Sequence, residues 1–299
     1  MDVNLPGQLS GVGRQIDVLI DASVAGQPFR TVVDAKMYNR PIDVKDVKEF
    51  LGMVEDVGAQ RGMMVTTIGY TPAAQERAHH DARDIELDVM SLAEFQKFQY
   101  PLGFPYSGER GVFLRAPFGW VVDNSGITGH AAILYQRGRD FDTAARVWEW
   151  AYLDFWHKDV EGTLVTIDEL LAKQDADLKE WNAATEIEHL DSRAESRYAT
   201  AIRLAKLANR PVWEYTGIIN FPEFMFFVVV LTPPQVANRN LRKLNEILSW
   251  ALPVNIHDER QDKSKPAAKI TVHVGEKRIE TSATVSRWNP HFRKPKMPQ

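Results

Sequence analysis

The chain has 299 residues, of which 44% are hydrophobic and 25% are charged, and its formal net charge is -4. This composition excludes global disorder and allows one large domain or two domains of ordinary size. We favour two domains. Because the chain has no cysteine, disulfides, thiolate catalysis and thiolate metal sites are excluded, and any metal must be held by oxygen or imidazole. Nucleic-acid binding would have to rest on a local basic surface, since the overall charge is slightly acidic.

The start of the chain, residues 1–6, has neither the basic nor the apolar segment of a signal peptide. No later stretch reaches the roughly 18 apolar residues that a membrane-spanning helix needs. The longest apolar run, Phe224–Leu231, predicts a buried strand instead. We therefore expect a cytoplasmic protein with no membrane partner.

The first third of the sequence predicts a mixed sheet. Two strand-like runs separated by a Gly/Gln/Pro turn indicate an antiparallel hairpin, and apolar residues at helical spacing then indicate a helix with Asp43 as N-cap and Gly58 as C-cap. A crossover helix joins parallel strands, so the order β-β-α-β-α-β gives a mixed sheet. The predicted elements are strands at 14–22 and 29–37, a helix at 44–57, a strand at 62–68, a helix at 72–80 and a strand at 85–90.

The remainder predicts a second, α+β unit. Residues 97–110 are rich in Pro, Gly and Tyr and are typical of a linker. The aromatic residues of 141–157 have helical spacing, which favours a core role over a stacking or partner-binding surface. The predicted elements are strands at 111–123, 131–136, 212–219 and 225–231, helices at 141–157 and 238–252, mostly polar helix in one or more pieces from 167 to about 207, a charged segment at 258–266, and a hairpin at 269–284 that turns at Gly275.

These elements divide the chain into four parts. Residues 1–96 form the first domain and residues 97–110 the linker. Residues 111–257 form an α+β domain, and residues 258–299 hold the charged segment, the β-hairpin and a basic tail. The order of elements in the second domain is weakly similar to small sandwiches of the PsbP and Mog1 type, a likeness of order that implies no function.

Asp17, Asp34 and Lys36 form the constellation that carries chemistry. Residues two apart in a strand point to the same face, so Asp34 and Lys36 project together, and Asp17 on the neighbouring strand can face the same pocket. Paired carboxylates suit Mg²⁺ or Mn²⁺, and a nearby ammonium can orient or deprotonate a water molecule. The residues therefore match the requirements of phosphodiester hydrolysis.

The alternative is a solvated polar stripe on a half-exposed hairpin, which spacing alone favours. The apolar neighbours shift the balance, because strands buried on both faces would make unpaired carboxylates costly. Those neighbours are Ile16, Val18, Leu19, Val32 and Val33.

Four segments occur in order at sensible distances: GRQIDVLI at 13–20, VVDAKMYNRPIDVKDV at 32–47, MMVTT at 63–67 and GYTPAA at 69–74. Together they resemble the Mrr-type branch of the PD-(D/E)xK restriction-endonuclease-like superfamily over about residues 11–95. The resemblance implies an α/β fold in which helices flank a mixed β-sheet core. A lone Asp-x-Lys would carry no such information.

The resemblance also implies a Mg²⁺-dependent site, which Mn²⁺ can serve as well. Asp17 and Asp34 would bind the metal, the backbone carbonyl of Ala35 would be a further ligand, and Lys36 would assist the water. Tyr38 and Arg40 lie just beyond and are candidates for nucleic-acid contact, although an ordinary loop cation is an equal alternative for Arg40. Gln15 is a further candidate for such contact, with a structural role favoured.

One feature departs from the pattern. Cores of this kind usually open with a helix whose Glu helps complete the metal site, but none of the 13 residues before Arg14 is Glu, and Asp2 is the sole acid there. Three explanations stay open: the helix is absent, the true start lies upstream, or the site binds without cutting.

Other motifs add little. The eight histidines form no HxH or HExxH arrangement, and no GxxxxGK[ST] phosphate loop indicates a nucleotide cofactor. The segment 287–296 mixes basic and aromatic residues and suits either nucleic-acid binding or a solvated tail.

We therefore expect a metal-dependent DNA endonuclease of restriction, defence or DNA repair, with DNA as partner. A homodimer is attractive because two symmetric sites can cut both strands. The alternative is a catalytically inactive module with the nuclease fold that binds nucleic acid or a protein.

Overall fold

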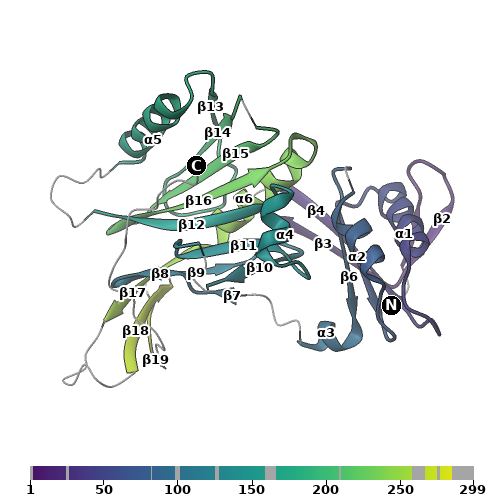
Figure 1. Cartoon of the computed structure of the whole chain (residues 1–299). Coiled ribbons are helices and arrows are strands. Elements are labelled where there is room, and N and C mark those ends of the chain that lie inside the picture. Colours follow the sequence, from purple (N-terminus) through teal and green to yellow (C-terminus); the bar gives the residue numbers. More distant parts are fainter. Residues whose placement is uncertain are drawn as a thin grey trace.

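Figure 1 shows the chain as a computed structural model with two units, which we call the first unit (residues 3–97) and the second unit (from residue 102). The structure describes residues 3–24, 27–81, 83–97, 102–124, 128–158, 166–208, 210–257, 267–274 and 277–284. The predicted charged segment at 258–266, the turn at Gly275 and the tail at 287–296 lie outside these residues. No helix in the described ranges is long and apolar enough to cross a membrane.

A four-stranded mixed sheet forms the centre of the first unit, as predicted. Its order is β3-β4-β5-β6, in which β3 and β4 are antiparallel and both other pairs are parallel. The strands are β3 (Val18–Val24), β4 (Gln27–Lys36), β5 (Arg61–Thr66) and β6 (Glu86–Ser91). The crossover helices α1 (Val44–Asp56) and α2 (Pro72–His79) make the parallel pairing possible, and α3 (Leu92–Lys97) follows β6.

Helix α1 begins where the sequence predicts it. Asp43 accepts hydrogen bonds from the backbone N–H groups of Lys45 and Asp46, and the Asp46 carboxylate accepts from the backbone N–H of Asp43, which completes a capping box. The helix buries Val47, Phe50, Leu51 and Val54 against the sheet. Gly62 on β5 permits this close approach, because a Cβ there would lie 2.6 Å from Leu87 and 2.7 Å from Phe50.

The predicted strand at 14–22 is two strands, which separate at Asp17. The first, β2 (Gly13–Ile16), pairs with β1 (Val3–Pro6) in a small antiparallel sheet, and β3 begins after a bend at Asp17. The described residues ahead of Arg14 thus form a strand and a turn, and they contain no helix.

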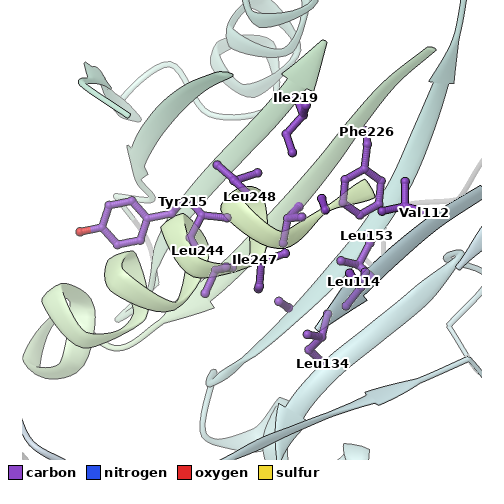
Figure 2. Packing of buried hydrophobic residues seen from close by; sticks show 14 of the residues in the cluster. Val112, Leu114, Leu134, Leu153, Tyr215, Ile219, Phe226, Leu244, Ile247 and Leu248 are labelled. Atoms are coloured by element: carbon purple, nitrogen blue, oxygen red, sulfur yellow. The ribbon is translucent and has the colours of Figure 1, made fainter. Parts of the chain in front are cut away.

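The second unit is built on a seven-stranded antiparallel sheet with the order β10-β11-β12-β16-β15-β14-β13. One face packs on α6 (Ala237–Trp250) and on β9, with residues such as Leu114, Phe226 and Leu244 in the core of Figure 2. Leu170 and Leu171 of α5 (Ile167–Trp181) pack on the other face. The strands are β10 (Trp120–Asp123), β11 (Ala132–Gln136), β12 (Trp150–His157), β13 (Glu186–Leu190), β14 (Thr200–Lys206), β15 (Trp213–Asn220) and β16 (Phe224–Thr232).

A six-stranded sheet lies beside it, with the order β19-β18-β17-β9-β7 and with β8 paired to β9. The predicted hairpin near the chain end is confirmed as strands β18 and β19, and β17 joins it to the second unit. The predicted linker contains the short strands β7 and β8. The strands are β7 (Leu102–Gly103), β8 (Tyr106–Ser107), β9 (Arg110–Arg115), β17 (Leu252–His257), β18 (Ala267–Val274) and β19 (Lys277–Thr284).

Three predictions for the second unit were wrong. The expected helix at 141–157 is only α4 (Phe141–Arg146), after which β12 runs through the aromatic residues. Ala151, Leu153 and Phe155 alternate into the main core of the second unit, in which Figure 2 shows Leu153, and the density of aromatic residues concealed this strand period. The expected helix at 167–207 ends at Trp181 and gives way to β13 and β14, and the strand expected at 111–123 is β9 and β10.

Buried ion pairs join the two units. Glu246 of α6 lies 2.6 Å from Arg61 on β5, and Lys243 of α6 lies 3.1 Å from Glu86 on β6. All four residues are less than 9% exposed, and Arg61 also lies 3.3 Å from Glu86. The polar face of α6 therefore covers β5 and β6 on the side of the sheet opposite α1.

Candidate active site

Asp34 and Lys36 lie together near the carboxyl end of β4. They point to one face of the strand, and Nζ of Lys36 lies 2.8 Å from Oδ2 of Asp34. Asp17 lies in the bend before β3, where its Oδ2 accepts a hydrogen bond of 2.7 Å from the backbone N–H of Ala35. The structure thus brings the three predicted residues to one place, although their roles remain a prediction.

The surroundings of Asp34 disfavour the ionised form of its carboxyl group. Burial raises the pKa of Asp34, and the neighbouring Asp17 carboxylate adds to this, so that the opposing effect of Lys36 is outweighed. The pKa of Lys36 is itself raised, because the ion pair with Asp34 outweighs the cost of burial. A half-buried pair of carboxylates of this kind gains stability from a cation between or beside them.

Tyr38 and Arg40 follow the site on the loop after β4. The centroid of the Tyr38 ring lies 5.8 Å from Nζ of Lys36 and 5.2 Å from Cζ of Arg40. Arg40 is held by the first turn of α1, with hydrogen bonds of 2.7 and 2.8 Å to the Asp46 carboxylate. The guanidinium therefore stabilises the turn between β4 and α1, and it remains 51% exposed.

The other two predicted residues lie at the margin. Ala35 is exposed on β4, and its backbone N–H holds Asp17 as described above. Gln15 is exposed on β2, opposite Asn4 in the small β1–β2 sheet, and so it does not belong to the sheet that carries Asp34 and Lys36.

The apolar context differs from the expectation of strands buried on both faces. Val18 is 46% exposed and Ile20 is 48% exposed, whereas Val32 is fully buried. The reason is that β3 is the edge strand and the second unit contacts the sheet at β5 and β6. Burial alone therefore supports a functional role for Asp34 and not for the whole hairpin.

Thr66 is a neighbour that the sequence argument missed. It lies opposite Lys36 in the parallel register of β4 and β5 and is 1% exposed. Its hydroxyl has no hydrogen-bond partner within the described part of the chain. A hydroxyl residue that ends the apolar run Met63–Val65 is the signal that could have found it. In the same residues, no group of three or more His, Asp or Glu side chains is arranged to hold a metal ion.

Two solved structures resemble parts of the chain. The protein of unknown function AF1548, a crystal structure, is 20% identical with a TM-score of 0.24, and the match covers 29% of this chain and 46% of that one. The solution structure of cyanobacterial PsbP (CyanoP) from Synechocystis sp. PCC 6803 is 12% identical with a TM-score of 0.34, over 51% of this chain and 92% of that one. Neither likeness carries an argument about function, because identities and TM-scores are low.

The chain thus spans less than half the length of the first of these structures. No curated protein matches the chain significantly. A family model described as a restriction endonuclease of the Mrr catalytic type matches residues 8–98, a range that contains Asp17, Asp34 and Lys36. Residues 8–98 therefore belong to the Mrr-type branch of the restriction-endonuclease-like superfamily, and the match does not extend to the second unit.

Proposed function

We propose that the chain is a metal-dependent DNA endonuclease whose catalytic residues are Asp17, Asp34 and Lys36. The observation that carries the proposal is the convergence of the Asp34–Lys36 pair with Asp17 inside the segment that matches the nuclease family. A role in restriction, defence or repair, and action as a dimer, are further parts of the proposal.

Each residue has a task that its surroundings support. Asp17 and Asp34 would hold Mg²⁺ or Mn²⁺, with the Ala35 carbonyl as a further ligand, and the raised pKa of Asp34 fits a carboxylate that a cation would stabilise. When bound, the metal would supply Lewis-acid stabilisation of charge at the phosphate and would favour ionisation of water. Lys36 would orient the attacking water and place a positive charge beside the phosphate, as its position 2.8 Å from Asp34 allows. The backbone N–H of Ala35 keeps Asp17 turned toward β4.

A binding module without activity is the second candidate. It is favoured by one observation: the described residues offer no third acidic side chain at the pair Asp17 and Asp34. Such a module would keep the fold and would bind DNA without hydrolysing it.

The test is cleavage of plasmid and linear DNA in Mg²⁺ and in Mn²⁺ by the wild type, Asp34→Asn and Lys36→Ala. Asp21→Asn is the matched control, because Asp21 lies on the same hairpin and pairs with Arg30. The proposal requires cleavage that depends on metal, survives in the control and falls at least about 100-fold in both site variants. A wild type that binds DNA and leaves it intact in both metals would instead establish the inactive module.

A further inference from the structure

Four large apolar side chains lie exposed where the chain leaves strands β4, β5 and β6. Met37 follows β4 and is 84% exposed, Ile68 follows β5 and is 56% exposed, and Leu92 follows β6 and is 40% exposed. Tyr38, next to Met37, is 37% exposed. We call these four residues the apolar rim. Exposed apolar side chains that gather at one edge mark an interaction surface, whereas scattered ones do not.

The register of the sheet places the apolar rim beside the candidate active site. Lys36 lies opposite Thr66, and Thr66 lies opposite Ser91, so the three strands end in one row. Adjacent strands lie about 4.8 Å apart, and the three exits therefore lie within roughly 10 Å of one another. Met37 directly follows Lys36, so a group that contacts the apolar rim is close to the Asp34–Lys36 pair.

The chemistry of the apolar rim suits nucleobases. Nζ of Lys36 lies 5.8 Å and Cζ of Arg40 lies 5.2 Å from the centroid of the Tyr38 ring, so an aromatic ring and two basic side chains lie together here. Bases stack on such rings while the cations attract the phosphates. Methionine, isoleucine and leucine are side chains that proteins insert between base steps.

A continuous duplex offers its base faces only after a base step has been unstacked, which costs a few kcal/mol per step, whereas unpaired bases are already accessible. A second copy of the chain is also a poor match, since a stable protein interface needs about 800 Å² from each partner and four side chains supply roughly half of that. A segment of unpaired or unstacked nucleotides can contact the apolar side chains with its bases and the basic side chains with its phosphates.

We propose that the apolar rim binds unpaired or unstacked bases next to the candidate active site, so that the chain prefers single-stranded or distorted DNA over continuous duplex. This inference rests on the proposed nuclease function and names the class of substrate for that site.

The experiment measures binding of the full chain to three fluorescent DNAs of one sequence: a duplex, the same duplex with a central mismatched bubble, and the single strand. Ca²⁺ replaces Mg²⁺, and Asp34→Asn is measured in parallel, so that cleavage does not interfere. The expected result is roughly tenfold tighter binding of the bubble and of the single strand than of the duplex. The rim variant Met37→Ser/Ile68→Ser should lose most of this preference and keep its duplex affinity and melting temperature.

Leu102→Ser is the control, because Leu102 is 72% exposed and lies outside the apolar rim. A 2-aminopurine base in the bubble should be quenched on binding to the wild type and much less on binding to Tyr38→Ser. The proposal is overturned if the three DNAs bind alike, if the rim variant keeps the preference, or if sedimentation shows that the rim variant only dissociates a dimer.

The two proposals fail separately. Base preference without cleavage of any DNA in Mg²⁺ or Mn²⁺ would retain the apolar rim as a binding surface and remove the nuclease. Equal binding of all three DNAs, together with metal-dependent cleavage, would retain the nuclease and remove the base preference.

Discussion

Arg137 of the second unit binds both carboxylate oxygens of Asp88 on β6, with its Nη2 2.6 Å from Oδ1 and its Nε 3.1 Å from Oδ2. Asp88 is 1% exposed, and Nη2 of Arg137 also donates to the Val89 carbonyl at 2.8 Å. Burial by itself would raise the pKa of Asp88, but His79 and Arg137 together hold that pKa below its ordinary value. One arginine of the second unit thus completes the hydrogen bonding of a strand in the first.

Removal of this arginine should lower the stability of the protein, because Arg137 links the second unit to β6 of the first. We expect Arg137→Ala to lower the free energy of unfolding by about 3–5 kcal/mol, because Asp88 would remain buried without its cation. Urea unfolding followed by circular dichroism measures the change. Arg146→Ala, an exposed arginine on nearby α4, should change stability by less than about 0.5 kcal/mol. Equal effects of both substitutions would refute a structural role for the Arg137–Asp88 pair.

Glu86 should make the contact between the units sensitive to acid. Burial would raise the pKa of Glu86, but Lys243 and Arg61 lower it from 4.5 to about 2. Because the folded pKa lies below the unfolded one, the stabilisation is complete above pH 4.5 and is lost as the pH falls toward 2. We expect Glu86→Gln to be less stable at pH 7 and to lose less stability than the wild type between pH 5 and 2.5, as urea midpoints across that range would reveal. An identical pH slope in both proteins would contradict the assignment.

The contact between α1 and β5 should tolerate no side chain at Gly62. A Cβ there would meet Leu87 at 2.6 Å, Phe50 at 2.7 Å and Val54 at 2.8 Å, so we expect Gly62→Ala to cost about 1–3 kcal/mol of unfolding free energy. Gly52 on the exposed side of α1 is the matched control, because a Cβ there meets nothing within 4 Å. Gly52→Ala should stabilise the protein by up to about 1 kcal/mol, since alanine favours the helix. A stabilising Gly62→Ala would show that the packing is looser than described.

Ionised Asp34 should lower the stability of the folded protein at pH 7. Since burial and Asp17 raise its pKa, the ionised form is disfavoured in the fold, and Asp34→Asn should raise the melting temperature at pH 7 in the presence of EDTA. The gain should disappear as the pH falls and the wild-type carboxyl becomes protonated. Asp21→Asn should behave in the opposite way, because the hydrogen bond from Arg30 lowers the pKa of Asp21. Scanning calorimetry of the three proteins at pH 7 and pH 4 provides the comparison, and a less stable Asp34→Asn at pH 7 would contradict it.

Local signals were sufficient for much of the first unit. Asp43 caps α1 as the sequence predicts, and the order of strands and helices predicts the mixed sheet, because both depend on neighbours in the chain. The pairing of Asp34 with Lys36 follows from the two-residue period of a strand. The match of residues 8–98 to the nuclease family agrees with the resemblance of the same motifs.

Tertiary structure decided the features that depend on distant partners. The period of β12 was hidden by its aromatic residues, and only burial of Ala151 and Leu153 in the core of the second unit selects the strand. The exposure of Val18 follows from the edge position of β3, which no local pattern contains. The pair Arg61–Glu246 joins residues 185 positions apart, and it forms because α6 carries charges that can be buried only against opposite charges of the first unit. Sequence alone therefore determined most local elements of the first unit and the spacing of the candidate site, whereas long-range packing selected the strand β12 and decided which side chains are buried, paired or left exposed.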